Sequence, residues 1–395
     1  MANKRLIWVV AGMYAVLAVA AAGKALVAPD RHTVYPKFIA GATRWWAGEP
    51  LYDQADELGA FRYSPTFAIV MTPFAWLGPR WGGAVWAVAG VGCYWAAVRW
   101  LARVLIEESD RDPCDASAEL RAARPDSATV LLLALPLAIR GSWNGQSNVL
   151  VAAALAAGAA CIVRQRMVAA AGLLAATFFL KVSPIAVAFL IAMMAPRRLA
   201  VWLALALLLG LALPFATTSP GLAVEQYRGW LTHLRTTADA RWPGFRDAWT
   251  AWETLIGPVY PPAYRAVQGV TLGVVGARLV MLRRQVAGLR GRILLALALG
   301  TAWLMLFGPA VEFNTFVIAA PALAWSVASA FRARRGRAWV ATAAMLIMVL
   351  GPGAVERALT TPLARLALPI GAAMWLGWLM RARGAAAALR AIPNE

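Results

Sequence analysis

The residues best suited to chemistry are polar side chains that end or interrupt apolar stretches of the chain. Asp30 directly follows the first apolar stretch, and Arg62 and Tyr63 stand where the chain returns to apolar sequence. Lys181 lies between two apolar runs in FFLKVSPIA, and Glu312 has apolar sequence on both sides in LFGPAVEFNTF. Polar groups in such positions are costly in lipid and usually functional. Together these types accept protons, hold anions and donate hydrogen bonds.

Each of these positions also has a structural alternative. Lysine and arginine at the edge of an apolar segment often extend toward water without any other role, so both interpretations stay open for Arg62 and Lys181. Glu312 has a shorter side chain that reaches water poorly. We therefore expect a partner cation or a polar ligand beside it.

Amides and histidines complete the set of candidates. The segment GSWNGQSN carries three amides: Asn144, Gln146 and Asn148. Asn-Gly is a common turn signal, but the flanking amides also fit a polar binding site, and both interpretations remain open. His32 stands beside Asp30 and is a candidate for the same site, whereas we expect a surface or structural role for His233.

Composition indicates the elements that must position these groups. Of 395 residues, 61% are hydrophobic and 14% charged, and the mean hydropathy is +0.62, whereas a soluble protein has about a quarter of its residues charged. Apolar stretches of roughly 15 to 25 residues recur along the chain, which suits a bilayer. We predict an all-α polytopic transmembrane bundle with about 12 crossings, forming a single integral membrane domain over residues 1–395.

Two apolar segments need separate comment. The stretch 6–28 follows Lys4 and Arg5, but it is long enough to span, so we predict the first transmembrane helix rather than a signal peptide. The short stretch 64–78 ends at Gly78-Pro79, and we expect it to be a non-crossing or half-crossing element.

The net charge of +19 lies in short basic clusters between apolar segments. Cytoplasmic loops of membrane proteins are rich in lysine and arginine, so we expect anionic membrane lipids, and no nucleic acid, as the partners of these clusters. The three cysteines match no metal or redox spacing. The basic clusters are Lys4 and Arg5, Arg164 and Arg166, Arg197 and Arg198, 283–292, 332–337 and 381–390.

Placing these clusters inside puts two long segments on the outer face. In 29–62, apolar residues at helical spacing predict an amphipathic helix on the membrane surface that ends at Gly48, before Pro50. The second segment, 219–262, is predicted to be a loop and is dense in tryptophan, arginine and proline. Such a surface suits a sugar or a phosphate, and an interfacial aromatic belt is the alternative.

Four segments of the chain resemble glycosyltransferase family 87. They are, in order, VYPKFIAGATRWWAGEPLY, FRYSPTFAIVMTPFAWL, WNGQSNVLV and RMVAAAGLLAATFFLKVSPIAVAFLIAMMAPRR. Members of this family are GT-C-type polytopic enzymes, of which the polyprenol-phosphate-mannose-dependent mannosyltransferases are the best known. RWPGFRDAW and FGPAVEFNTFVIAAP are similar to a subgroup of bacterial proteins, which implies a multi-pass protein of the bacterial plasma membrane.

The resemblance implies roles for individual residues. A carboxylate just after the first helix deprotonates the acceptor hydroxyl in such enzymes, which makes Asp30 the expected base. The family aspartate usually stands four residues before the motif tyrosine, but position 31 here is arginine, so Glu312, Glu49 and Asp53 are alternatives. Basic groups hold the donor phosphate, and the candidates are Arg62, Lys181, Arg140 and Arg246. The expected substrate-binding residues are Tyr35, Tyr63, Asn144, Gln146, Asn148 and Glu312.

The expected reaction moves a hexose, with mannose favoured, from a polyprenyl-phosphate donor to a lipid or glycan acceptor at the outer face. The sequence has no glycine-rich phosphate loop, which disfavours a nucleotide-sugar donor, and no metal-ligand cluster, so we expect a metal-independent reaction without a cofactor. One alternative is a non-enzymatic transporter or flippase of lipid-linked sugars. Clustering of the polar residues at one side favours an enzyme over a conduit, and a structural subunit of an envelope complex is a third possibility.

Overall fold

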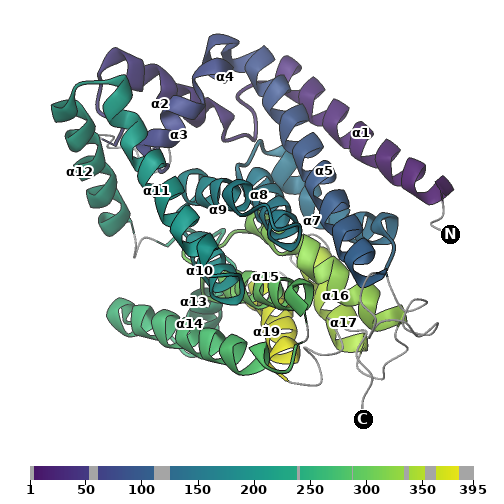
Figure 1. Cartoon of the computed structure of the whole chain (residues 1–395). Coiled ribbons are helices and arrows are strands. Elements are labelled where there is room, and N and C mark those ends of the chain that lie inside the picture. Colours follow the sequence, from purple (N-terminus) through teal and green to yellow (C-terminus); the bar gives the residue numbers. More distant parts are fainter. Residues whose placement is uncertain are drawn as a thin grey trace.

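The computed structural model is helical. It describes residues 4–52, 61–110, 125–237, 241–286, 288–332, 338–351 and 362–381. Within these ranges no strand is present, and an isolated antiparallel bridge joins Phe245 to Glu312. The predicted all-α class is therefore confirmed (Figure 1).

The helices fall into three length groups. The longest are α1 (Lys4–Val27), α5 (Gly83–Asp110), α11 (Arg198–Thr217), α14 (Pro261–Arg283) and α15 (Gly288–Phe307). Those of intermediate length are α2 (Tyr35–Ala47), α7 (Ser127–Trp143), α8 (Asn148–Val163), α9 (Met167–Leu180), α10 (Ile185–Met194), α12 (Pro220–Thr236), α16 (Ala320–Arg332), α17 (Ala338–Leu350) and α19 (Ala367–Met380). The shortest are α3 (Pro65–Val70), α4 (Thr72–Trp76), η1 (Gly78–Gly82), α13 (Ala248–Leu255), η3 (Phe313–Ile318) and η5 (Pro362–Leu366).

Six helical segments in the described ranges are long and apolar enough to cross a membrane, and five shorter apolar helices accompany them. The total of about 12 crossings therefore stays a prediction. The six segments are Arg5–Val27, Gly78–Glu107, Arg198–Thr217, Pro261–Arg283, Gly288–Phe307 and Leu363–Met380.

The centre of the bundle is formed by helices that are apolar on all sides. Nearly every residue of α8 and α15 is buried. Alanine and glycine make up much of α8, and such small residues let neighbouring helices approach closely in membranes. Peripheral helices differ, because α1 buries Val10 and Tyr14 against its neighbours while Val16 and Val19 remain exposed. Apolar exposure of this kind is expected for side chains that face lipid.

The segment 64–78 does not form a long helix. It is divided among α3, α4 and the start of η1, which have six, five and five residues. At about 1.5 Å per residue none of these pieces approaches the thickness of a bilayer. Pro65 opens α3 and Gly78 adopts a φ of +72°, which a residue with a side chain rarely does. The chain therefore turns here before α5 begins.

Helix α2 occupies the middle of segment 29–62 and ends at Gly48, whose φ is +71°. Its apolar face points into the protein and not toward lipid. Phe38 packs edge-on against Phe67 of α3 and against Trp86 of α5, with ring centroids 5.1 and 5.6 Å apart. Trp46 is an exception, being half exposed while its indole N–H donates to Thr72. Phe67 of α3 and Trp86 of α5 offer this amphipathic face a partner that the sequence pattern does not reveal.

Segment 219–262 is largely helical, although the sequence predicted a loop. Ser219 caps α12, where its hydroxyl accepts from the Leu222 N–H, and Asp247 caps α13 by accepting from the Thr250 N–H. Both caps belong to the residue types that favour helix starts, and proline follows Ser219 at the first helical position. The loop prediction relied on the density of aromatic and basic residues and did not take these two helix caps into account.

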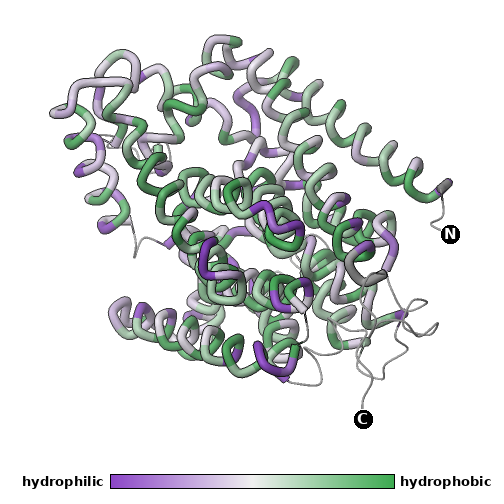
Figure 2. The backbone as a smooth tube through the Cα atoms, in the orientation of Figure 1, coloured by the Kyte–Doolittle hydropathy of each residue, from purple (hydrophilic) through white to green (hydrophobic). Residues whose placement is uncertain are grey.

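The described helix ends separate into two groups. At one end, Arg164 pairs with Glu107 and Arg332 pairs with Asp126, while Arg290 donates to the Leu105 carbonyl. These contacts join the last turns of α5, α8 and α16 to the first turns of α7 and α15. The opposite ends of α5, α7 and α8 lie beside α2. Figure 2 shows hydrophobic residues along the lengths of α1 and α11 and hydrophilic ones concentrated at helix ends and connections.

Candidate functional site

The turn between α7 and α8, residues 144–147, is the structural centre of the site. Asn144 caps α7, and Gly145 continues the turn with a φ of +61°. A Cβ added at Gly145 would stand 2.9 Å from the Thr33 hydroxyl, so the position requires glycine for space as well as for conformation. Asn148 then opens α8 and is buried. This turn is the Asn-Gly segment that the sequence identified.

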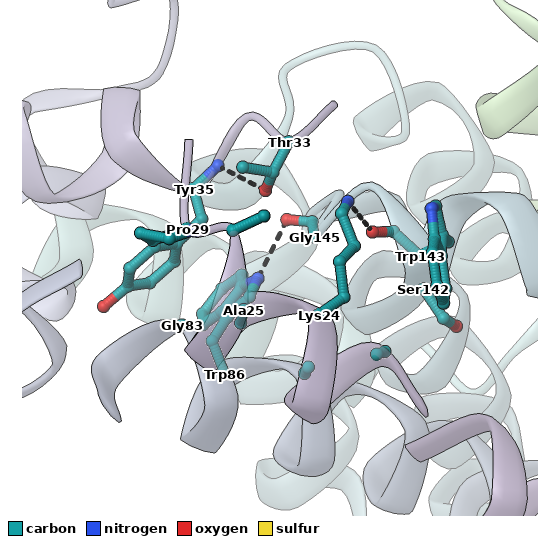
Figure 3. Close-up of a pocket in the computed structure, with 13 residues that line it drawn as sticks. Lys24, Ala25, Pro29, Thr33, Tyr35, Gly83, Trp86, Ser142, Trp143 and Gly145 are labelled. Carbon is teal, nitrogen blue, oxygen red and sulfur yellow. Dashed lines mark hydrogen bonds between the residues drawn. The ribbon is translucent and has the colours of Figure 1, made fainter. Parts of the chain in front are cut away.

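One side of the turn holds the chain around Asp30. The Lys24 ammonium, in the last turn of α1, donates to the carbonyls of His32 and Trp143, both at 2.7 Å, and lies 5.2 Å from the Trp143 ring centroid. The Thr33 hydroxyl donates to the Asn144 carbonyl and accepts from the Tyr35 N–H (Figure 3). Asp30 is exposed. It lies on the short connection between α1 and α2, which these hydrogen bonds hold against the end of α7.

A cavity of about 20 Å³ lies beneath this connection, lined by residues of α1, α5 and the turn. Its wall includes Lys24, Trp86 and Ser142, and the buried Ser142 hydroxyl has no hydrogen-bond partner within the described residues (Figure 3). A space of this size holds about one water molecule, which needs polar partners of this kind. The cavity therefore suits a buried water and is too small for a sugar.

The other side of the turn holds Tyr63 and the residues around it. The Ser147 hydroxyl donates to the Leu180 carbonyl and also contacts the Tyr63 side chain. Ser64 caps α3 and donates to the Phe179 carbonyl at 3.0 Å, which ties this segment to the end of α9. Burial raises the pKa of the Tyr63 phenol. The phenol therefore stays protonated and can donate a hydrogen bond.

Lys181 lies immediately after α9 and points toward η3. Its ammonium donates to the Thr315 hydroxyl at 3.3 Å, and that hydroxyl accepts in turn from the Glu312 backbone N–H at 3.2 Å. Burial lowers the pKa of the Lys181 ammonium, and the nearby Glu312 carboxylate opposes that shift. No ion pair between Lys181 and Glu312 is present among the described residues. A cation and an acid thus share one site without neutralising each other directly.

Arg62 belongs to the same side of the turn. Its charge influences both Tyr63 and His233, so the three groups lie near one another. Burial and the Arg62 charge both lower the pKa of the His233 imidazole below its ordinary 6.5. His233, on α12, is therefore neutral at pH 7 and packs beside Tyr52, with ring centroids 6.0 Å apart.

The remaining cation candidates lie at the edge of this group. Arg140 is exposed at the end of α7, with its guanidinium 5.2 Å from the Phe313 ring centroid. Arg246 donates from its guanidinium to the carbonyls of Pro243 and Phe245 and so helps to fold its own loop.

The other predicted site residues differ in their positions and contacts. Tyr35 is buried and its hydroxyl donates to the Phe74 carbonyl, which gives it a structural contact. Glu49 is exposed after α2, and its backbone carbonyl accepts from the Gln226 amide. Gln146 is half-buried in the turn, and Asp53 lies outside the described residues.

Three further residues contribute to the site beyond those that the sequence predicts. Ser147 stands within the Asn-Gly segment, where the neighbouring amides give the stronger polar signal. Thr315 lies three residues after Glu312, the spacing at which a side chain returns to the start of a helix. His233 was expected at the surface or in a structural role, and no signal in the sequence links α12 to Arg62.

Among the described residues, no group of three His, Cys, Asp or Glu side chains is arranged to hold a metal ion.

Comparison with known proteins identifies the family. The model of glycosyltransferase family 87 matches residues 61–309, which is more than half of the chain. The match includes the α7–α8 turn, Arg62 and Lys181, whereas Asp30 and Glu312 fall outside it. No curated protein matches the chain. With its apolar helices and this match, the chain belongs to glycosyltransferase family 87 and is a membrane glycosyltransferase.

Proposed function

We propose that the protein transfers a hexose, mannose in the first instance, from a polyprenyl-phosphate donor to a hydroxyl of a lipid or glycan acceptor. The observation that carries this proposal is the arrangement around the α7–α8 turn. An exposed carboxylate, Asp30, is held on one side, and two cations, Arg62 and Lys181, lie on the other. Such a pair of environments suits proton removal from one substrate and charge stabilisation on the other.

The proposed reaction is a direct displacement at the anomeric carbon. Asp30 accepts the proton of the acceptor hydroxyl as its oxygen forms a bond to that carbon. The bond between the anomeric carbon and the phosphate oxygen breaks, and its electron pair leaves with the polyprenyl phosphate. Lys181 and Arg62 compensate the negative charge that the phosphate gains. Arg140, beside Phe313, is a secondary contact for the same phosphate.

Glu312 and Tyr63 are assigned to the donor sugar. A carboxylate accepts hydrogen bonds from sugar hydroxyls, and a protonated phenol donates one. The Glu312 carboxylate accepts from the Thr315 N–H in the capping box of η3 and forms no ion pair with Lys181, so it keeps acceptor capacity for a ligand. Glu312 is therefore a donor-binding residue in this proposal, and Asp30 remains the base.

The positions of three arginines from the basic clusters support an extracytoplasmic site. Arg164, Arg290 and Arg332 gather at the helix ends opposite the α7–α8 turn. Because basic loops favour the cytoplasmic side, the site end faces outward in this proposal, in the plasma membrane of a bacterium.

Sugar transfer by purified protein in lipid vesicles tests the proposal. Radiolabelled polyprenyl-phospho-mannose is supplied with a lipid extract from the host, and wild type is compared with Asp30→Asn and Glu312→Gln. Transfer by wild type, near-total loss in Asp30→Asn and weakened donor binding in Glu312→Gln are expected. Near-total loss in Glu312→Gln alone would move the base to that residue. Movement of labelled lipid across the bilayer without transfer would replace the enzyme by a lipid-sugar transporter.

A further inference from the structure

A buried ion pair joins Arg241 and Asp247 in the connection between α12 and α13. Two guanidinium nitrogens donate to the two carboxylate oxygens, Nη2 to Oδ1 at 2.7 Å and Nη1 to Oδ2 at 3.1 Å. Only 1% of the Asp247 side chain is exposed. Planar bidentate pairing of this kind fixes orientation as well as distance.

Neighbouring side chains hold the pair in place. The Arg241 guanidinium lies 4.8 Å from the Phe245 ring centroid and 4.9 Å from that of Trp249. Its Nη2 also donates to the Thr250 hydroxyl, and that hydroxyl donates to the Phe245 carbonyl. The loop between residues 241 and 250 is therefore closed around one guanidinium.

This closed loop contacts the segment that carries Glu312. The Arg246 N–H donates to the Val311 carbonyl at 2.7 Å, and Phe245 forms the isolated antiparallel bridge with Glu312. Phe245 is buried, so the bridge is shielded from solvent. The orientation of Glu312 thus depends on a loop that is distant in sequence.

The connection continues to Lys181. The Glu312 N–H donates to the Thr315 hydroxyl, which also accepts from the Lys181 ammonium. A displacement of the bridge would therefore shift both groups that the donor site is proposed to use. Glu312 is the N-cap of η3, so its position is set by the bridge to Phe245 on one side and by the capping bonds with Thr315 on the other.

We propose that the Arg241–Asp247 pair is a positioning device for the donor-binding site. It acts through the Phe245–Glu312 bridge and does not itself contact substrate. Replacing a buried ion pair by apolar groups often leaves stability unchanged, so such a pair is weak support for stability and fits a role in fixing one backbone register. This inference rests on the proposed function, because it assigns the device to the donor that Glu312 and Lys181 would hold.

Two substitutions separate positioning from folding. Asp247→Asn keeps a side chain that caps α13 but removes the charge that Arg241 requires. Combining it with Arg241→Met leaves no unpaired buried charge, so this double variant is expected to melt within a few degrees of wild type. Glu107→Gln is the matched control, because it breaks an ion pair at the opposite end of the bundle.

Kinetics give the first readout. With polyprenyl-phospho-mannose as donor, we expect KM to rise about tenfold in the double variant, with kcat nearly unchanged, since donor binding is what the shifted Glu312 weakens. Glu107→Gln is expected to match wild type in both constants. A double variant that folds and retains the wild-type KM would overturn the inference.

A second readout needs no activity. Glu312→Cys is placed in a protein whose native cysteines, Cys93, Cys114 and Cys161, are replaced by alanine. Labelling of the introduced thiol by a water-soluble maleimide should proceed several-fold faster when the same chain also carries Arg241→Met and Asp247→Asn. The reason is that the bridge no longer protects the thiol. Equal labelling rates would reject the positioning role of the Arg241–Asp247 pair, whether or not transfer is observed. Absence of transfer by wild type would reject the proposed function and leave this test intact.

Discussion

The Lys24 ammonium donates a 2.7 Å hydrogen bond to the Trp143 carbonyl, which fixes the last turn of α1 to the end of α7. A second bond of the same length reaches the carbonyl of His32, two residues after Asp30. His32 adopts a φ of 50°, an uncommon conformation for a residue with a side chain. Lys24 therefore helps to hold the connection that carries the exposed Asp30 carboxylate against the end of α7.

Removing this lysine should slow catalysis more than it weakens donor binding. In Lys24→Met both carbonyls lose a charged donor, and the Asp30 connection is released from α7. We expect kcat to fall about tenfold or more with little change in donor KM, because misplacing a base affects the chemical step. Lys24→Arg, which can donate to two carbonyls, should recover part of the rate. Steady-state transfer assays in vesicles measure both constants, and an unchanged kcat in Lys24→Met would contradict the prediction.

Donor binding should weaken at alkaline pH because of Lys181. Burial lowers the pKa of this ammonium below the ordinary 10.5, so proton loss begins at a lower pH than for an exposed lysine. As pH rises through that lowered pKa the phosphate loses a cation, and donor KM should increase. Lys181→Arg remains charged over the whole range and should lose this alkaline rise. The measurement is donor KM as a function of pH for wild type and Lys181→Arg. The same rise of KM at alkaline pH in both proteins would show that Lys181 does not cause it.

Glycine at position 145 should be required for the site, whereas Gly172 in α9 should be replaceable. Gly145→Ala meets a positive φ and a contact of 2.9 Å to the Thr33 hydroxyl. We expect it to destabilise the protein by at least about 1 kcal/mol and to disturb the turn. Gly172→Ala in α9 has open space around its Cβ and should be neutral or slightly stabilising. Melting temperatures in detergent compare the two, and equal values would show that the turn tolerates a side chain.

Sugar selectivity should depend on Glu312. The Glu312→Gln amide keeps the size of the side chain but loses the charge-assisted hydrogen bonds to sugar hydroxyls. We expect donor KM to rise about tenfold and discrimination among polyprenyl-phospho-hexoses to narrow. Competition between labelled mannose and glucose donors measures this narrowing. An unchanged ratio of mannose transfer to glucose transfer would show that Glu312 does not contact the donor sugar.

Much of the fold can be predicted from the sequence, because composition and apolar length are sufficient for it. Low charge and repeated apolar stretches require helices in a bilayer. The end of α2 at Gly48 also follows from local chemistry, since glycine adopts the left-handed conformation there. The direction of its apolar face does not follow, because the sequence pattern cannot distinguish lipid from Phe67 and Trp86 as a partner.

The candidate site is less predictable for a related reason. Asp30, Lys181 and Glu312 attract attention individually, since each is a polar group next to apolar sequence. Their grouping depends on long-range contacts such as the one between Lys181 and Thr315, which no periodicity encodes. Arg241 illustrates the same limit. In the sequence it is one of many arginines, and its pairing with Asp247 is specified by the folded loop alone.

The α7–α8 turn has a thermodynamic consequence for an enzyme that uses two substrates. The carbonyls of Trp143, at the end of α7, and of Asn144 accept hydrogen bonds from the Asp30 side, and the Ser147 hydroxyl donates to the Leu180 carbonyl on the Lys181 side. A ligand that shifts this short segment alters the affinity of the other half for its own ligand. Linkage is reciprocal, so donor and acceptor would change each other's dissociation constant by the same factor. The sign of the corresponding coupling free energy determines whether the protein favours the ternary complex or holds one substrate at a time.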